Sequence, residues 1–171
     1  MSLSPEHRSL LMRANRLLGA SMVEANLVKI DSLEAANERL LELIGAGDYR
    51  KGSVLSILAY ELQVVKESDV IQHAMDDHGL GLVDLRAYET PDDFRATIDI
   101  GACWATWSYP FDREEDVYFI ATAYYMSPAV RTFWEKQFNG PIVWYATTLE
   151  MLSDSFEKLE ASRVGKPPAS K

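Results

Sequence analysis

The chain has 171 residues and a formal net charge of −9. That length suits one domain or two small subdomains with a shared hydrophobic core, and it needs no disulfide or metal for stability. The acidic balance argues against nucleic acid and anionic lipid as partners, although a local pocket can still hold a small anion. The single cysteine allows no disulfide within the chain, no apolar run reaches the ~18 residues of a membrane helix, and charges interrupt the first apolar run as they would not in a signal peptide. We therefore expect a cytoplasmic protein without membrane insertion.

The first half of the chain has the apolar spacing of helices. Ser4 and Pro5 form a helix start, with a capping hydroxyl followed by proline at the first helical position. Asp31 begins another helix and forms a capping box with Glu34. Gly79 ends the last helix of this half. The predicted helices cover residues 5–18, 20–25, 31–44, 54–62 and 67–77, and residues 80–85 form a short extended stretch.

The second half combines strands and helices. Aromatic and β-branched side chains predict two strands joined as a hairpin by a polar turn. Thr147 and Glu150 form a further capping box at the start of the last helix. The predicted order is a strand over 102–111, a turn over 112–116, a strand over 117–125, a helix over 128–138, a strand over 141–146 and a helix from Thr147 to Ser162.

This order is β-β-α-β-α. Its strand–helix–strand part implies a right-handed crossover and parallel pairing, and the two amphipathic helices can cover the sheet. We predict an α+β fold with an N-terminal helical repeat subdomain over residues 1–86 and a small β-β-α-β-α sandwich over residues 87–163. Residues 164–171 lack apolar content and are predicted to be a disordered tail.

The first half contains an internal repeat. Residues 27–33 resemble residues 64–70 at an offset of 37 residues, and each copy has an apolar pair, a lysine, a polar helix start and an apolar-faced helix. Upstream, Leu18 corresponds to Leu55, and Met22 corresponds to Ala59. The alternative is that two short helical hairpins are alike by chance.

Two segments carry a resemblance to a known family. LLGASMVEANLVKIDSLEAANERLLE and VIQHAMDDHGLGLVDL resemble the repeats in the N-terminal domains of type II secretion and type IV pilus assembly ATPases. The order of elements extends the resemblance over roughly residues 10–160, while the ATPase module itself is absent. The resemblance implies a regulatory or docking domain. In some members of that family the repeats bind cyclic di-GMP.

The family's ligand-binding pattern is carried over only in part. Leu18 and Gly19 match the Leu-Gly pair of the motif, but Leu17 stands where a basic residue is expected and Arg16 lies one place early. Asn26 and Gln63 replace the second glycine of the two copies. Binding would require backbone close to the nucleotide, a cation for the phosphate and apolar packing on the base. The residues that this implies as ligand-binding are Arg16, Leu18 and Gly19, together with Arg50 and Gly52 in the inserted loop.

Other chemistry finds little support in the sequence. His73 and Asp77 share a helix face, but two ligands are too few for a zinc site. The carboxylates over residues 112–116 are expected in a solvated turn. Cys103 lies in an apolar stretch and is predicted to be a buried thiol without a histidine beside it. We therefore expect no metal and no cofactor.

Three functions stay open at this point. The first is a non-catalytic regulatory or adaptor domain that binds a protein partner, such as a secretion or pilus component. The alternative is a nucleotide sensor of the cyclic di-GMP type with a degenerate site. The third is an enzyme whose catalytic residues are separated in the sequence. The sequence favours the non-catalytic regulatory or adaptor domain, so we expect no enzymatic activity.

Overall fold

The structure is a computed structural model that describes residues 3–164. The helices are α1 (Pro5–Glu24), α2 (Ile30–Gly45), α3 (Val54–Ser56), α4 (Glu67–His78), α5 (Asp92–Arg95), α6 (Ile100–Thr106), α7 (Pro128–Gln137) and α8 (Leu149–Val164), with short helical turns η1 (Tyr49–Lys51), η2 (Ile57–Glu61, of π type) and η3 (Leu85–Ala87). The strands are β1 (Gly81–Leu82), β2 (Ser108–Glu114), β3 (Val117–Thr122) and β4 (Ile142–Ala146). Apart from Val164, the predicted tail lies outside the described residues.

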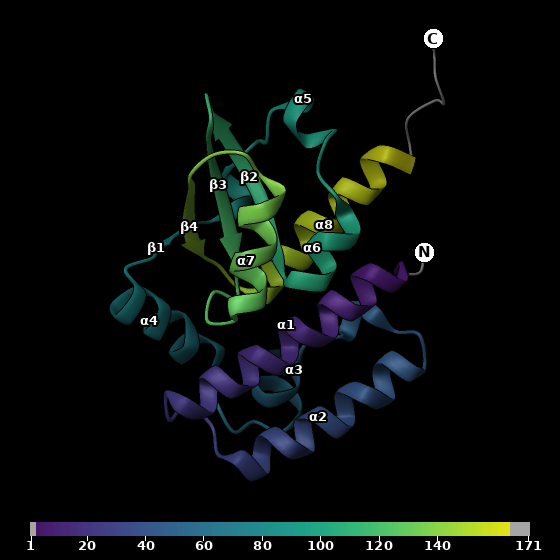
Figure 1. The fold of residues 1–171 in the computed structure, drawn as a ribbon, viewed down its shortest axis with the longest axis vertical. Coiled ribbons are helices and arrows are strands. Elements are labelled where there is room, and N and C mark those ends of the chain that lie inside the picture. The colour runs from purple at the N-terminus through teal and green to yellow at the C-terminus, as the bar shows by residue number, and fades with distance from the viewer. Residues whose placement is uncertain (1–2, 165–171) are drawn as a thin grey trace.

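The helices of the first half lie on one side of the molecule and the sheet on the other. In Figure 1, α1 runs between α2 and the sheet half, and it packs against α6 and α7. α1 continues without a break to Glu24, so the separate helix predicted over 20–25 is wrong. The predicted α+β class is confirmed.

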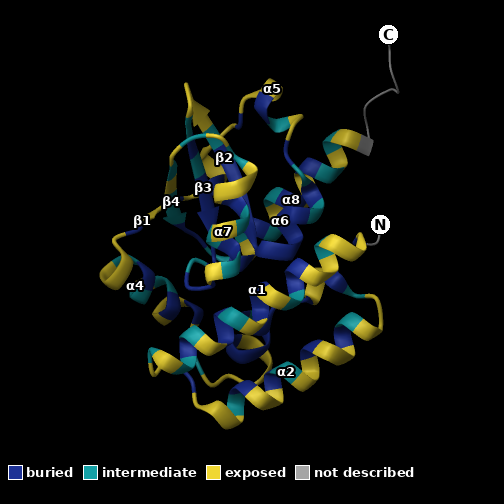
Figure 2. Ribbon diagram, viewed as in Figure 1, coloured by how far each residue is buried: buried dark blue, intermediate teal, exposed yellow. Residues whose placement is uncertain are grey.

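Within residues 3–164 the strands form one sheet of order β1-β4-β3-β2. β2 and β3 pair antiparallel as the predicted hairpin, and β3 pairs parallel with β4 through α7, as the crossover rule predicts. β1 adds to the sheet by pairing parallel with β4. The division at residue 86 stays a prediction, and one hydrophobic cluster takes in residues from both sides of it (Figure 2).

α7 and α8 cover opposite faces of the sheet. Tyr118 of β3 stacks on Phe138, just after α7, with ring centroids 4.2 Å apart. Tyr109 pairs across the hairpin with Ala121, whose side chain points to the opposite face from that of Tyr118. The Tyr109 ring lies 6.3 Å from that of Phe156 on α8. The aromatic residues of the second half therefore fill two layers of core.

The strand predicted over 102–111 is wrong in its first half, because residues Ile100–Thr106 form α6. The Asp99 side chain accepts a hydrogen bond from the Ala102 amide at 3.2 Å and caps this helix. Trp107 ends it in the left-handed conformation, with φ 47°. The aromatic residues that suggested a strand reflect burial rather than β structure, since α6 is almost wholly buried.

Two predicted capping boxes are also wrong. Lys29 occupies the cap position of α2, so that Asp31 lies inside the first turn. At α8, the Thr148 hydroxyl accepts from the Met151 amide at 3.2 Å, whereas the Thr147 hydroxyl points to the Met151 sulfur. Each real cap lies one or two residues away from the predicted one, which is within the usual uncertainty of helix ends.

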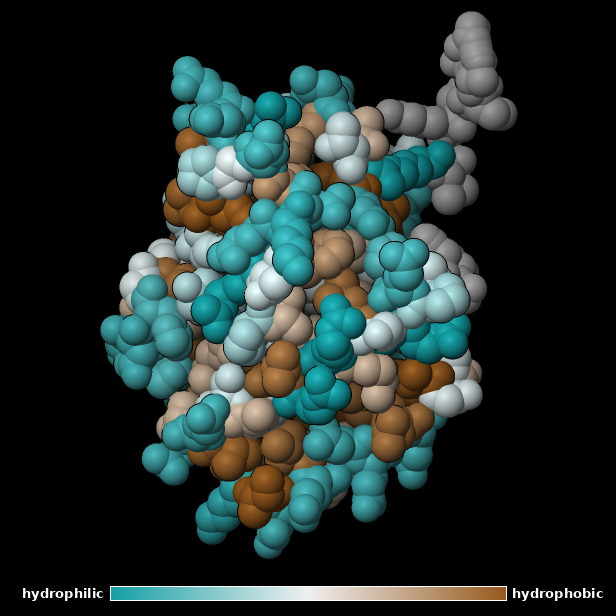
Figure 3. All heavy atoms as spheres, in the orientation of Figure 1, coloured by the Kyte–Doolittle hydropathy of each residue, from teal (hydrophilic) through white to brown (hydrophobic). Residues whose placement is uncertain are grey.

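The face of the molecule shown in Figure 3 is mostly hydrophilic. Figure 3 shows one face, on which apolar side chains form separate patches between hydrophilic ones, so no single apolar surface dominates that face. Of the large apolar side chains that are exposed, several belong to the second repeat copy. The exposed residues are Ile30, Leu41, Tyr60, Leu62, Val64, Leu82, Tyr88 and Val143.

Candidate functional site

The two repeat copies share an unusual backbone feature. Asn26 and Gln63, which lie 37 positions apart, are both in the left-handed region, with φ 61° and 55°. Each follows the end of a helical segment and leads into the next helix through an extended lysine, Lys29 before α2 and Lys66 before α4. Residues other than glycine rarely adopt positive φ. Both copies thus keep the turn for which glycine would be the usual residue.

Some equivalent positions of the two copies are also buried alike. Leu18 and Leu55 are buried, and so are Leu33 and Val70 of the following helices. Because the same offset relates both the turns and the buried positions, the two copies are structural repeats as well as similar sequences. The exposed Lys29 and Lys66 lie at the same place in both.

Asn15 holds the first copy against the start of the second. Its Nδ2 donates to the carbonyl oxygens of Leu11 and Gly52 at 2.9 and 3.1 Å. Its Oδ1 accepts from the Val54 amide at 2.8 Å and from the Tyr124 hydroxyl at 2.6 Å. Asn15 is fully buried, and every one of its polar atoms is bonded. This network fixes how the two copies lie relative to each other and to the sheet half.

The predicted ligand residues on α1 lie in different environments. Arg16 is exposed, whereas Leu18 and Gly19 are buried. A side chain at Gly19 would meet the Leu33 methyl group at 2.5 Å, so this glycine allows α1 and α2 to approach closely. The close packing of α1 against α2 therefore explains why position 19 is a glycine, without invoking a ligand.

The other two predicted residues lie near η1. Arg50 bonds to Glu160 at 2.6 Å and lies over the Trp104 ring at 4.9 Å, in the wall of a cavity of about 680 Å³. Gly52 is buried, and its carbonyl accepts from Asn15. Glu160 already occupies the guanidinium of Arg50, so a phosphate would have to compete with it. The ligand roles of all five residues stay predictions.

The surface beside the second turn is hollowed into an open groove of about 800 Å³. Tyr60 is 59% exposed and Val64 44% exposed, and they supply its apolar part. Lys66 and Asp69 supply charge. The lining residues are Ala59, Tyr60, Gln63, Val64, Val65, Lys66, Glu67, Ser68, Asp69, Ile71 and Thr148.

A buried carboxylate forms the floor of this groove. Glu67 accepts from the Tyr60 hydroxyl through Oε1 and from the Leu149 amide through Oε2, the latter at 2.6 Å. It thereby joins the second turn to the start of α8, where a negative charge is favourable. The hydrogen bond to Glu67, aided by the partial burial of the hydroxyl, raises the pKa of Tyr60 to about 12. Val23 and Ile30 replace this pair in the first copy, so the groove distinguishes the two copies.

The other chemical candidates have ordinary structural roles. His73 and Asp77 lie 3.5 Å apart, and residues 3–164 contain no group of three or more side chains placed to hold a metal ion. Cys103 is fully buried, and burial raises the pKa of its thiol well above the usual value. Among the described residues, no helix has both the length and the apolar character needed to span a membrane.

No family model matches this sequence, and no curated protein matches it. Among solved structures, one of MshE determined with cyclic di-GMP matches with a TM-score of 0.53 and 17% sequence identity. The match covers 83% of this chain and 97% of that one. The chain shares the fold of MshE. At this identity the likeness extends to the fold alone.

Sequence reasoning identified the repeat but not the groove. Tyr60 and Glu67 come together across the second turn, and neither residue departs from an ordinary helix pattern in the sequence. The sequence gives one hint, which is that Gln63 stands where the motif has glycine. This departure from the motif does not by itself indicate a groove.

Proposed function

We propose that this chain is a non-catalytic regulatory domain with the MshE fold that acts by binding a protein partner through the groove at the second repeat. The supporting observation is the exposed apolar set of that turn, Tyr60, Leu62 and Val64, beside the charged Lys66 and Asp69. Exposed aromatic and aliphatic side chains with a polar rim are typical of protein interfaces. The sequence resemblance points to a component of a secretion or pilus machine as the partner.

Cyclic di-GMP is the second candidate ligand. It is favoured by the match to an MshE structure that was determined with this nucleotide. It is disfavoured by the residues themselves, because Leu17 stands where the motif has a cation, and Gly19 is covered by Leu33. Lys29 and Lys66 are the cations that remain at equivalent places beside the two turns.

The two candidates are separated by thermal melting with cyclic di-GMP, with GTP as the control. A ligand at a hundred times its Kd stabilises a protein by about 2.7 kcal/mol, which for a chain of this size raises the Tm by roughly 5–11 °C. The docking proposal expects no selective rise. A selective rise that Lys29→Met or Lys66→Met removes would establish the nucleotide sensor instead.

The docking proposal is tested directly with the purified secretion and pilus assembly proteins encoded in the same genome, by biolayer interferometry. We expect one of them to bind, and Tyr60→Ser and Val64→Ser each to weaken that binding by about tenfold or more, as central interface residues do. Leu41→Ser is the matched control, because Leu41 is 57% exposed and lies outside the groove. Equal binding by all three variants would rule out the groove as the interface.

A further inference from the structure

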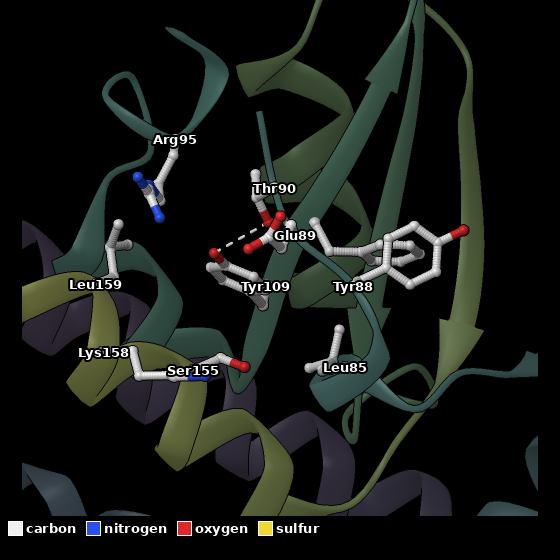
Figure 4. Close-up of a pocket in the computed structure, with 10 residues that line it drawn as sticks. Leu85, Tyr88, Glu89, Thr90, Arg95, Tyr109, Ser155, Lys158 and Leu159 are labelled. Carbon is white, nitrogen blue, oxygen red and sulfur yellow. Dashed lines mark hydrogen bonds between the residues drawn. The ribbon is translucent and has the colours of Figure 1, made fainter. Parts of the chain in front are cut away.

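A second, smaller cavity lies far along the chain from the repeat turns. It has a volume of about 250 Å³ and is enclosed by the segment after η3, α5, strand β2 and helix α8. Figure 4 shows Arg95 reaching in from one side, Ser155 and Lys158 coming from α8, and the Tyr109 hydroxyl facing Thr90 near Glu89. Polar groups from separate segments therefore converge on one small space, as they do in binding sites for small molecules.

The charges of this lining differ from those of the protein as a whole. The chain carries a net charge of −9, yet this cavity contains two cations, Arg95 and Lys158, and one carboxylate, Glu89. Arg95 is paired with Asp92 at 2.5 Å. Within residues 3–164, neither Lys158 nor Glu89 takes part in an ion pair. One positive and one negative group are thus left to meet opposite charges on a ligand.

Arg95 is held in place by a neighbouring arginine. The Arg163 guanidinium on α8 donates to the carbonyl oxygens of Arg95, Ala96 and Ile98, at 2.8, 3.3 and 2.7 Å. These bonds fasten the segment after α5 to the helix that also carries Lys158. The two cations of the cavity therefore have fixed backbone positions, which reduces the entropy lost when a ligand binds.

Two buried hydroxyls supply hydrogen bonds in the cavity. Thr90 and Tyr109 are both buried, and their oxygen atoms lie 3.3 Å apart. Each hydroxyl can both donate and accept a hydrogen bond, so a single shared bond leaves both able to bond a ligand. Burial raises the pKa of Tyr109, which keeps it a neutral phenol.

The rest of the wall is apolar. Tyr88 packs edge-on against Phe111 with centroids 4.7 Å apart, and Leu85 and Leu159 complete this side. Such a wall accommodates a short hydrocarbon group. A volume of about 250 Å³ admits a molecule of amino-acid size but not a dinucleotide.

We propose that this cavity binds a free amino acid or a zwitterion of the same size, with its carboxylate toward Lys158 and its ammonium group toward Glu89. This pairing gives each of the two unpaired charges an opposite charge on the ligand, whereas a simple organic acid would bring a second negative charge near Glu89 and be repelled by it. The site shares no lining residue with the groove at the second repeat, so it is independent of the function proposed above.

The test is amide NMR of the full chain titrated with the protein amino acids one at a time. Propionate and propylamine serve as probes that carry only one of the two charges. We expect one or more amino acids to shift the amide signals of residues 88–95 and 155–159, and neither single-charge probe to do so at the same concentration. Glu89→Gln and Lys158→Met should each weaken the affinity by about tenfold or more, the usual loss for a charged hydrogen bond.

Lys51→Met is the matched control, since the Lys51 side chain is 71% exposed and lies outside the cavity. It should leave the affinity unchanged. The proposal is overturned if no amino acid shifts these signals. It is equally overturned if propionate binds as tightly as the amino acid and Glu89→Gln has no effect, because the site would then bind a plain anion.

Discussion

Replacing Asn15 with leucine should destabilise the protein strongly, because leucine has a similar size but no polar atoms. The Val54 amide would lose its partner in a buried position, which costs about 1–3 kcal/mol. The Gly52 carbonyl and the Tyr124 hydroxyl would each lose one bond worth about 1 kcal/mol. Each of them keeps another partner, at 3.4 Å from the Trp107 indole and 2.7 Å from Ser53 respectively.

After the greater hydrophobicity of leucine is allowed for, the expected loss for Asn15→Leu is about 2–4 kcal/mol. For a chain of this length that lowers the Tm by roughly 4–16 °C. Urea unfolding followed by circular dichroism measures the loss in the free energy of unfolding. Asn37→Leu, at a partly exposed position of α2, is the control. Tyr124→Phe should cost about 1 kcal/mol and should be less than additive with Asn15→Leu, because the two share a bond. A loss below about 0.5 kcal/mol for Asn15→Leu would refute the role of this network.

Three further predictions follow from single contacts. Gly19→Ala should destabilise the protein by about 1–3 kcal/mol through overpacking against Leu33, partly offset by about 1 kcal/mol of helix propensity; a net gain in unfolding free energy would show that α2 can move aside. Tyr60 should ionise near pH 12 in an ultraviolet titration, and Glu67→Gln should lower its pKa toward about 10. Because the raised pKa favours the neutral phenol in the folded state, this contribution to stability is complete below about pH 10 and is lost as the pH rises toward 12. Cys103 should react with a thiol reagent only after unfolding, and rapid labelling of the folded protein would contradict its burial.

The elements that could be predicted from the sequence are those with a clear period and a clear end. α4 has apolar residues at helical spacing and a glycine in the left-handed conformation directly after it, with φ 72°. The crossover from β3 through α7 to β4 follows from the handedness rule for strand–helix–strand connections. That rule holds for almost any chain with this order of elements. Local chemistry and topology agree in these segments, so the prediction succeeds.

The prediction was wrong at α6 because this segment has neither a clear period nor a clear end. Its residues include Trp104, Cys103 and alanines, which are typical of any buried segment, and the cap at Asp99 was not recognised. A short, fully buried helix has no exposed face and hence no period to read. The cavity at Thr90 and Tyr109 could not be predicted either, because its walls come from residues 85–95, 109–111 and 155–159, which meet only through the fold.

The repeat turns show how a fold can persist after a motif has changed. Asn26 and Gln63 adopt a left-handed backbone conformation that costs any residue except glycine about 1 kcal/mol or more. The surrounding structure keeps both residues in that conformation. In both copies the turn carries the chain from one packed helix to the next. In the first copy Leu33 packs against Gly19, while beside the second turn the surface opens into a groove floored by Glu67. The two copies keep the same turn but differ in their surface. If the proposed docking groove is the interface, the effect of substitutions on binding is therefore confined to the second copy.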